Sequence, residues 1–330
     1  MRAVVVREFG GIENAKLDEM PNPTPKPGEV LLETHATAVN FVDLIMMSGK
    51  YQFKPDLPFV PGKLPAGRVA AVGAGVTLFK AGDPAIAMAE QGGFAEFVTM
   101  PENQCVRLPA LLPLTDAAAM ALIYDTAWFA LRDRARVAPG ETVLVLGATG
   151  GVGLAAIQLA KAFGAKVLAG VASADKADMV RAAGADAILD LAVPDLHESL
   201  RAQVYSETDQ RGADIILDML GGDIFDAAIR ALAWRGRLVV IGFAAGRIPT
   251  LKANYLLLKN IEVSGLQVSD YRKRMPREMQ AAFQEIFALH AAGKLKPLPT
   301  KAFPMAQFAA AMHEIADRKL RGRVVLTMGK

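Results

Sequence analysis

The pattern of hydrophobic and polar residues divides the chain near residue 115. Before that point, alternating or short apolar runs such as AVVV at 3–6 and VLLETHATAV at 30–39 lie between Pro- and Gly-rich turns and predict strands. After it, near-continuous apolar runs alternate with helical stretches of about 10 to 15 residues, which is typical of a parallel sheet covered on both faces. A last apolar run, RVVLTM at 323–328, has no strand after it to pair with, so we expect it to return to the first, mainly β region.

Composition narrows the class of protein. The chain has 330 residues, of which 52% are hydrophobic, and a formal net charge of +3, which fits a globular protein of two domains. The basic residues are scattered, apart from one cluster at 272–277 that we interpret as a solvated loop, with an anion site as the alternative; a nucleic-acid partner is therefore not expected. Cys105 is the single cysteine, which excludes an intramolecular disulfide. Neither a signal peptide nor an apolar run of about 18 residues is visible, so we expect a cytoplasmic protein without membrane contact.

A glycine-rich loop joins an apolar run to a helical stretch in VLVLGATGGVGLAAIQLA at 143–160. Glycines let the backbone approach a pyrophosphate, whose charge then lies at the N-terminus of the following helix. The strand before it, the helix after it and the further strand-helix units make a dinucleotide site the favoured interpretation. The residues expected to bind the pyrophosphate are Gly150, Gly151 and Val152.

The end of the next predicted strand indicates the type of cofactor. A site for NAD usually places a carboxylate there, about 20 residues after the glycines, whereas this chain has Ser173 and then Lys176, both able to hold a 2′-phosphate. Asp175 lies between them and weakens the argument. Ser173 as a helix cap and Lys176 as a surface residue remain the alternative. We predict NADPH as the cofactor.

Several motifs resemble, in order, the zinc-independent quinone oxidoreductase branch of the medium-chain dehydrogenase/reductase superfamily. They include AVNFVDLIMMSGKY at 38–51, PFVPG at 58–62, GGFAEFV at 92–98, LVVIGFAAG at 238–246 and GRVVL at 322–326. The resemblance implies a Rossmann doubly wound parallel sheet plus a GroES-like, mainly β catalytic domain, and a homodimer or homotetramer. We expect the catalytic domain at 1–122, the Rossmann domain at 123–264 and the returning part of the catalytic domain at 265–330.

The same resemblance bears on metal binding. The zinc-dependent branch carries Gly-His-Glu where this chain has PGKLPAG at 61–67, so that Leu64 stands near the position of the glutamate. Cys105 and the four histidines are isolated in sequence and lack the spacing of zinc ligands. We predict no metal site, and therefore hydride transfer to an acceptor that is already activated, a quinone or an α,β-unsaturated carbonyl.

Reduction of an enone builds negative charge on the carbonyl oxygen and needs a proton for the α-carbon. The resemblance places Tyr51 where related enoyl thioester reductases carry a proton-donating tyrosine, and where quinone reductases have a cofactor contact; a packed aromatic is the alternative. Asn40 matches an asparagine near the nicotinamide ribose, and Asp43 is interpreted as a structural partner that orients this loop. Tyr51 and Asn40 are thus the candidate catalytic residues, and both are also expected to contact the cofactor.

Other cofactor contacts follow from the resemblance alone. Asp125 precedes one of these contacts, Thr126, in the sequence and is either a local acid or the cap of a helix that begins there. The remaining expected contacts are Thr126, Gly242, Phe243, Ala244, Leu266, Gln267 and Arg323.

The acceptor is expected to be small and apolar, with Phe41, Ile45 and Phe59 lining its pocket or, alternatively, belonging to the core. The leading hypothesis is an NADPH-dependent reductase of quinones or enones. A 2-enoyl thioester reductase is the enzymatic alternative, which would need a basic channel from Lys50, Lys54 and Lys63. A cofactor-binding structural or RNA-binding protein resembling zeta-crystallin is the alternative of another class.

Overall fold

The computed structural model describes residues 1–317 and 320–329. They form two compact units. Unit 1 comprises residues 1–122, 269–283 and 297–330, and unit 2 comprises residues 123–268 and 284–296. The domain limits predicted from the sequence assign all of 265–330 to the catalytic domain, whereas the compact units assign 265–268 and 284–296 to unit 2.

Unit 2 is built on a parallel sheet whose strands follow the order β10-β9-β8-β11-β12-β13. The first three strands run outward from the centre and the next three run outward in the other direction, which is the doubly wound Rossmann order. The strands are β8 (Thr142–Leu146), β9 (Lys166–Val171), β10 (Ala187–Asp190), β11 (Ala213–Asp218), β12 (Leu232–Val240) and β13 (Glu262–Gly265). The Rossmann sheet predicted from the sequence is therefore confirmed.

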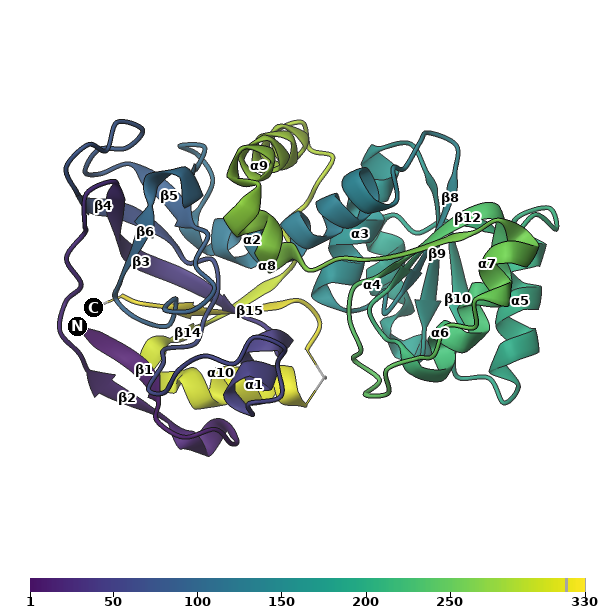
Figure 1. Cartoon of the computed structure of the whole chain (residues 1–330), viewed down its shortest axis with the longest axis horizontal. Coiled ribbons are helices and arrows are strands. Elements are labelled where there is room, and N and C mark those ends of the chain that lie inside the picture. Colours follow the sequence, from purple (N-terminus) through teal and green to yellow (C-terminus); the bar gives the residue numbers. More distant parts are fainter. Residues whose placement is uncertain (318–319, 330) are drawn as a thin grey trace. The chain divides into compact units, whose positions relative to one another are not determined.

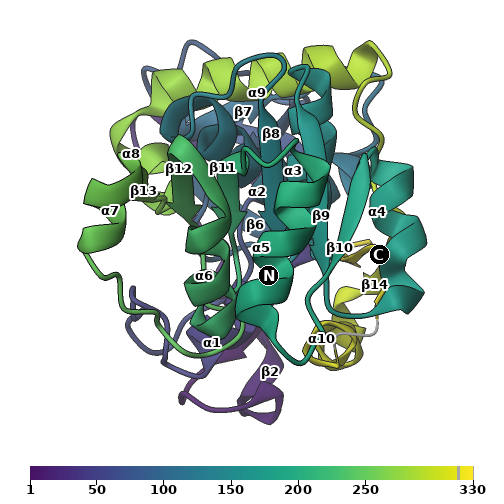
Figure 2. The ribbon, with the colours of Figure 1, turned by 90° about the vertical axis from the view of Figure 1, so that its right-hand side faces the viewer.

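Helices cover this sheet on both faces, with α3 and α4 on one side and α5 and α6 on the other (Figures 1 and 2). Every residue of β8 is buried, because both of its faces lie under helices. Leu144 and Leu146 pack with Leu168 and Ile216 in one core cluster, and burial of each such side chain is worth about 1.5 to 3 kcal/mol. The helices of this region are α3 (Gly151–Ala162), α4 (Ala177–Ala183), α5 (Leu196–Glu207), α6 (Gly222–Ala228) and α7 (Asn254–Lys259).

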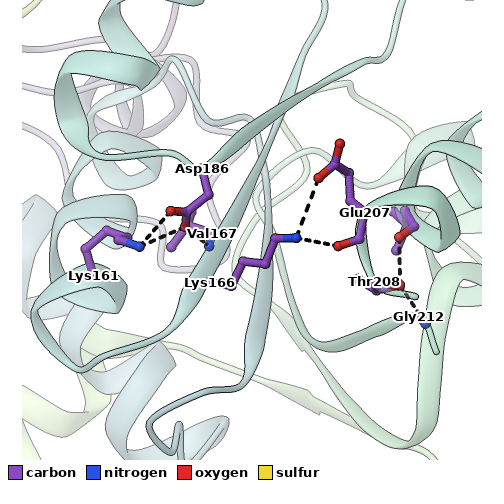
Figure 3. A network of polar contacts seen from close by, with 8 residues as sticks. Lys161, Lys166, Val167, Asp186, Glu207, Thr208 and Gly212 are labelled. Carbon is purple, nitrogen blue, oxygen red and sulfur yellow. Dashed lines mark hydrogen bonds and ion pairs between the residues drawn. The ribbon is translucent and has the colours of Figure 1, made fainter. Parts of the chain in front are cut away.

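Polar contacts connect helices α3 and α5 of unit 2 to its sheet (Figure 3). The Lys161 ammonium of α3 binds both carboxylate oxygens of Asp186, at 2.9 and 2.8 Å, and Asp186 also accepts from the backbone of Val167 in β9. Lys166 of β9 donates to the carbonyl of Glu207, the last residue of α5. These contacts lie at the end of the sheet opposite to the glycine loop, because Lys166 and Val167 begin their strand. They fix the helices without taking part in the candidate site.

Unit 1 contains a mainly antiparallel sheet in the order β14-β15-β3-β4-β5-β7, with β6 paired to β3, and a separate pair of strands, β1 and β2. The chain's last strand β15 pairs antiparallel with β3, so that Val324 lies opposite Val39. The predicted return of the last apolar run to the first region is confirmed. The strands are β1 (Arg2–Val6), β2 (Ala15–Glu19), β3 (Glu29–Val39), β4 (Ala66–Val72), β5 (Pro84–Ala87), β6 (Phe97–Pro101), β7 (Cys105–Arg107), β14 (Thr300–Pro304) and β15 (Arg323–Thr327).

The remaining helices are α1 (Phe41–Met47), α2 (Leu114–Trp128), α8 (Val268–Arg274), α9 (Pro276–Ala291) and α10 (Phe308–Ala316). Helix α1 begins directly after β3, which places Asn40 at the junction of the sheet and the helix. Within residues 1–317 and 320–329, none of the helices combines the length and the apolar character that a membrane crossing needs.

Candidate active site

The glycine loop of unit 2 is too tightly wound for larger residues. Gly147 directly follows β8 and has a φ of +78°, in the left-handed region that favours glycine. A Cβ atom on Gly153 would lie 2.3 Å from the carbonyl oxygen of Gly147, a distance that no side chain tolerates. The turn therefore brings the start of α3 close to the end of β8. The first N–H groups of a helix have no intrahelical acceptor, so those of Gly151 and Val152 are suited to bind a phosphate.

Other predicted cofactor positions lie at the same edge of the sheet. Leu146 of β8 is in register with Asp218 of β11, Asp218 with Val240 of β12, and Val240 with Gly265 of β13. Residues that follow these parallel strands therefore emerge together at their carboxyl ends, where open α/β sheets bind ligands. Those residues are Gly150, Gly151 and Val152 after β8, Gly242, Phe243 and Ala244 after β12, and Leu266 and Gln267 after β13.

Asp218, which the sequence did not single out, binds the backbone of the segments that follow β11 and β12. One carboxylate oxygen accepts from the backbone N–H groups of Leu220 and Gly221, at 2.8 and 2.9 Å, and the backbone carbonyl of Asp218 accepts from Ile241 at 2.7 Å. The other carboxylate oxygen is buried without a hydrogen-bond partner among the described residues. Burial raises the pKa of Asp218, while the two backbone hydrogen bonds oppose that shift. The sequence gives little signal for this role, because an aspartate at a strand end looks like any turn residue.

Residues 173–176, which are predicted to decide between NADPH and NADH, include the carboxylate of Asp175. The Ser173 hydroxyl donates to Asp175, and the backbone N–H of Lys176 reaches the carbonyl of Ser173 at 3.3 Å. Ser173 and Asp175 are exposed and Lys176 is half-buried. The serine and the lysine thus lie on one short turn, as expected, and the carboxylate of Asp175 shares that turn.

Thr126 lies on α2, in unit 2, and is buried. Its hydroxyl donates to the carboxylate of Asp125 at 3.1 Å. Asp125 is fully buried and lies in the interior of the helix, which excludes the alternative that it caps a helix beginning there.

In unit 1, Asp43 fixes the loop that carries Asn40. One oxygen of the Asp43 carboxylate accepts from the backbone of Asn40 at 2.8 Å, and the other accepts from the backbone of Gly62 at 3.3 Å. Burial raises the pKa of Asp43 to about 6, against these hydrogen bonds and the charge of Lys63, which favour the anion. The role predicted for Asp43, a structural partner that orients the loop, fits these contacts.

Arg323 is the partner of Asn40. The guanidinium donates from Nη2 to the side-chain oxygen of Asn40 at 2.6 Å and from Nε to the carbonyl of Ala119 at 3.1 Å. Both side chains are buried. Burial lowers the pKa of Arg323 to about 10, and the charge of Asp43 opposes that shift. The arginine predicted to contact the cofactor is therefore a direct contact of Asn40.

Lys63 is buried and paired with Glu90. Its ammonium lies 2.5 Å from one carboxylate oxygen of Glu90 and 5.4 Å from the centre of the Tyr51 ring. Glu90 also accepts from Ser269 at 2.6 Å and from Arg272 at 2.7 Å. Burial alone would raise the pKa of Glu90, but Arg272 and Lys63 outweigh it and lower that pKa to about 2.

This polar cluster corrects one interpretation of the sequence. The basic segment 272–277 was interpreted as a solvated loop, but its first residue, Arg272, is 1% exposed and lies in α8. Glu90 and Ser269 are 179 residues apart in the chain, so no local spacing could have joined them. Lys63 is also too deeply buried to belong to a surface channel with Lys50 and Lys54, both of which are exposed.

The predicted pocket residues differ in their surroundings. Ile45 is half-buried and Phe41 is exposed, and the candidate proton donor Tyr51 is half-buried as well. Phe59 is buried in a core cluster with Val4, Val6 and Phe94, so the structure gives it a packing role.

Leu64 adopts an unusual conformation beside Lys63. It is fully buried with a φ of +50°, which costs a residue other than glycine roughly 1 kcal/mol or more. Its backbone N–H donates to the carbonyl of Ala89, the residue before Glu90, at 3.0 Å. This turn holds the backbone of Lys63 next to the segment that carries its partner.

Comparison with known proteins identifies the family. Residues 26–110 match the alcohol dehydrogenase GroES-like domain and residues 151–287 match the zinc-binding dehydrogenase family. A quinone oxidoreductase-like protein 2 homolog from Nematostella vectensis is 36% identical over 328 residues, which cover 98% of this chain and 88% of the relative. The chain belongs to the zinc-independent quinone oxidoreductase branch of the medium-chain dehydrogenase/reductase superfamily.

Solved structures agree with this family. The Escherichia coli quinone oxidoreductase complexed with NADPH has a TM-score of 0.90 and 28% identity, over 99% of this chain and 100% of that chain. The enoyl reductase CurK has a TM-score of 0.88 and 27% identity, over 99% of both chains. The GroES-like and Rossmann regions expected of this quinone oxidoreductase relative are both confirmed.

The family match named for zinc binding raises the question of a metal. In the part of the chain that the structure describes, no three His, Cys, Asp or Glu side chains are placed to hold a metal ion. Cys105 is buried, and burial raises the pKa of its thiol to about 12, so it stays protonated at neutral pH. Within the segment 61–67, the polar side chain is that of Lys63, a cation that cannot act as a metal ligand while protonated.

Proposed function

We propose that the protein is an NADPH-dependent oxidoreductase that reduces a quinone or an α,β-unsaturated carbonyl compound without zinc. The observation that carries the proposal is the glycine loop of unit 2, which has the shape that a pyrophosphate needs. In unit 1, the buried Asn40 and the half-buried Tyr51 lie on one segment, and Arg323 binds Asn40. Quinone oxidoreductase relatives, one of them complexed with NADPH, support it.

The residues of unit 2 fit the cofactor. The tight turn of Gly147 and Gly153 leaves the N-terminus of α3 open to a pyrophosphate, and Ser173 and Lys176 would hold the 2′-phosphate. When bound, NADPH supplies a hydride. The Ser173 hydroxyl, now bound to Asp175, would have to turn toward the phosphate.

The residues of unit 1 would donate the proton that the reduction needs and hold the cofactor in position. As hydride reaches the β-carbon of an enone, negative charge grows on the carbonyl oxygen, which hydrogen-bond donors stabilise. Tyr51 would hold the proton at its Oη that is passed to the α-carbon, and Asn40, fixed by Arg323 and Asp43, would orient the nicotinamide ribose. The saturated ketone leaves with one hydride and one proton added.

A purified-protein assay tests this proposal. NADPH and NADH are each offered with 1,4-benzoquinone, a cyclic enone, a 2-alkenal and crotonyl-CoA, and oxidation of the cofactor is followed by absorbance. We expect oxidation with NADPH preferred and with at least one of the first three acceptors reduced. No oxidation with any acceptor would favour a structural or RNA-binding protein.

A 2-enoyl thioester reductase is the second candidate, supported by the likeness to an enoyl reductase. Against it, Lys63 is buried with Glu90, and the Lys54 ammonium lies 4.5 Å from the centre of the Phe9 ring, so neither extends freely as part of a basic channel. Crotonyl-CoA as the best acceptor by more than about tenfold in kcat/KM, a difference of about 1.4 kcal/mol, would favour this candidate.

The proposal also includes a cytoplasmic homodimer or homotetramer. Sedimentation analysis of the purified protein measures that state, and a monomer at micromolar concentration would contradict it.

A further inference from the structure

Asp218 is buried at the carboxyl end of β11, in unit 2, and its two carboxylate oxygens differ in their surroundings. Oδ1 accepts from the backbone N–H groups of Leu220 and Gly221, at 2.8 and 2.9 Å. Oδ2 is buried without a hydrogen-bond partner in the part of the chain that the structure describes. Buried polar atoms without partners are rare because they destabilise a fold, so a residue that keeps one is a candidate for a local role.

The bonded oxygen, Oδ1, fixes the turn at 219–222, which leads from β11 into α6. An aspartate oxygen that accepts from backbone N–H groups two and three residues further on closes a turn of this kind. Gly221 has a φ of +68° and Gly222 a φ of +59°, both in the left-handed region. Glycines restrict the backbone little, so the Asp218 carboxylate supplies a restraint that the residues of the turn lack.

The same turn is hydrogen-bonded to residues 241–247, the segment that follows β12. The carbonyl of Met219 accepts from the N–H of Ala244 at 3.1 Å, and the carbonyl of Leu220 accepts from the N–H of Ala245 at 2.9 Å. Strands β11 and β12 pair in parallel and lie side by side (Figure 2), so these bonds continue the contact of the two strands beyond their ends. The position of the segment therefore depends on the conformation of the turn.

Close packing adds to these hydrogen bonds. A Cβ atom on Gly221 would lie 3.0 Å from Cδ1 of the Phe243 ring and 3.1 Å from the carbonyl oxygen of Arg247. The turn and the segment are therefore in close contact at Phe243, which is expected to contact the cofactor together with Gly242 and Ala244. A shift of the turn would displace these three positions.

The surroundings of the turn have restraints of their own. At the far end of the segment, the Arg247 guanidinium forms ion pairs with two carboxylates of α6. In the glycine loop, the N–H of Gly150 donates to the carbonyl of Gly147 at 3.0 Å. Loss of the Asp218 carboxylate is therefore expected to loosen residues 242–244 and to leave the glycine loop in place.

We propose that Asp218 is a positioning residue, which fixes the turn at 219–222 and thereby places residues 242–244 for the nicotinamide half of NADPH. The inference rests on the proposed function and deepens it. Oδ1 needs only to accept hydrogen bonds, so the negative charge of the side chain is not required for this role. A segment that is held in place before binding does not have to be ordered by the ligand, which favours both affinity and the alignment of the reacting atoms.

Two variants of Asp218 and one control separate positioning from stability. Asp218→Ala removes the acceptor, and Asp218→Asn keeps an acceptor without the charge. Asp214→Ala is the matched control, because Asp214 lies on the same strand and its carboxylate accepts from the backbone of Thr142 at 2.8 Å, at the opposite end of the sheet. Thermal unfolding measures the stability of each variant. If Asp218→Ala does not fold, Asp218→Ser takes its place, since a serine hydroxyl closes such turns more weakly.

Two ligands report on the two halves of the cofactor. NADPH has both halves, whereas 2′,5′-ADP has the adenosine and its phosphates without the nicotinamide, and calorimetric titration measures the affinity for each. We expect Asp218→Ala to weaken NADPH binding about tenfold and 2′,5′-ADP binding less than about twofold, because the loosened segment has to be ordered by the nicotinamide. Asp218→Ser should weaken NADPH binding at least about threefold, and Asp218→Asn less than about threefold. Asp214→Ala should leave the ratio of the two affinities unchanged.

Turnover gives a second readout. With Asp218→Ala we expect kcat to fall about 100-fold even when NADPH saturates the protein, because hydride transfer depends on the alignment of the nicotinamide. A loss of stability alone would not lower kcat in this way, and Asp214→Ala should change kcat less than about twofold.

The outcomes distinguish this inference from the proposed function. If a folded Asp218→Ala or Asp218→Ser variant keeps the wild-type ratio of affinities, or if Asp218→Asn loses NADPH binding as strongly as Asp218→Ala, the positioning role is overturned and the proposed function stands. The same conclusion follows if Asp214→Ala changes the ratio as much as Asp218→Ala does. A wild-type protein that binds NADPH but reduces no acceptor would overturn the proposed function, and the ratio of affinities would then judge Asp218 alone. A wild-type protein that binds neither ligand would overturn both.

Discussion

Arg323 donates to the side-chain oxygen of Asn40 at 2.6 Å, across the antiparallel pairing of the chain's last strand with β3. The two residues are 283 positions apart in sequence and both are buried. The asparagine amide is therefore held from two sides, by Arg323 at its oxygen and by the carbonyl of Ala38, which accepts from its nitrogen at 3.0 Å.

Arg323→Met is expected to lower the free energy of unfolding by about 3 kcal/mol, because it removes the buried donor to the side-chain oxygen of Asn40 and one of the two cations that interact with Asp43. Urea unfolding at neutral pH measures the loss. Arg7→Met is the control, since the ion pair of Arg7 with Asp18 is exposed and its loss should leave stability nearly unchanged. Equal effects of the two variants would contradict the structural role of Arg323.

Glu90→Gln should destabilise the protein in a way that depends on pH. The pKa of Glu90 is lowered from 4.5 to about 2 in the folded protein, so its stabilising effect is complete above pH 4.5 and is lost as the pH falls toward 2. The variant should be less stable by about 3 kcal/mol at neutral pH, and this deficit should shrink below pH 4.5. Urea unfolding over that range measures it.

Glu262→Gln is the control for Glu90, because Glu262 forms an exposed ion pair with Arg136. It should change stability by less than about 1 kcal/mol at any pH. A deficit of Glu90→Gln that stays constant with pH would show that the carboxylate charge is not what stabilises the cluster.

Asp175→Asn tests the choice of cofactor. The carboxylate bound to Ser173 would repel a 2′-phosphate on the same turn, so its removal should strengthen NADPH binding relative to NADH binding by about fivefold, or about 1 kcal/mol. Fluorescence titration with both cofactors measures the ratio. Asp209→Asn, an exposed substitution in the same unit, is the control. An unchanged ratio would remove the turn of Ser173 and Lys176 from the phosphate site.

Tyr51→Phe separates the two roles considered for Tyr51. As proton donor, its loss should lower kcat for an enone by about 10² to 10⁴ with little change in NADPH binding. As a cofactor contact alone, its loss should raise the KM for NADPH and leave kcat unchanged. Steady-state kinetics distinguish the two, with Tyr255→Phe, a half-buried tyrosine of α7, as the control.

The sequence predicts the Rossmann region well, because its signals are local. The glycine loop, the apolar strands and the helices between them lie in order along the chain, and each of these signals comes from neighbouring residues. The return of β15 was also predictable, since an apolar strand without a neighbour has to pair elsewhere.

The polar cluster of unit 1 could not be predicted in the same way. Lys63, Glu90 and Arg272 come from three distant segments, and none of them has a spacing that signals a site. The absence of histidine and glutamate at 61–67 is visible in the sequence and predicts the lack of a metal site there. The burial of Lys63 beside Tyr51 is visible only in the structure. For Phe59 the sequence left two alternatives, pocket lining and core, and the structure packs this side chain in the core.

The central claim, hydride transfer to an activated acceptor, is tested most directly by the position of a label in the product. NADPH carrying deuterium on C4 is incubated with the protein and a cyclic enone, and the product is analysed by NMR and mass spectrometry. The account predicts a saturated ketone with deuterium on the β-carbon and a solvent proton on the α-carbon. Deuterium on the carbonyl carbon of an alcohol would contradict it, as would the absence of NADPH oxidation with both the enone and 1,4-benzoquinone.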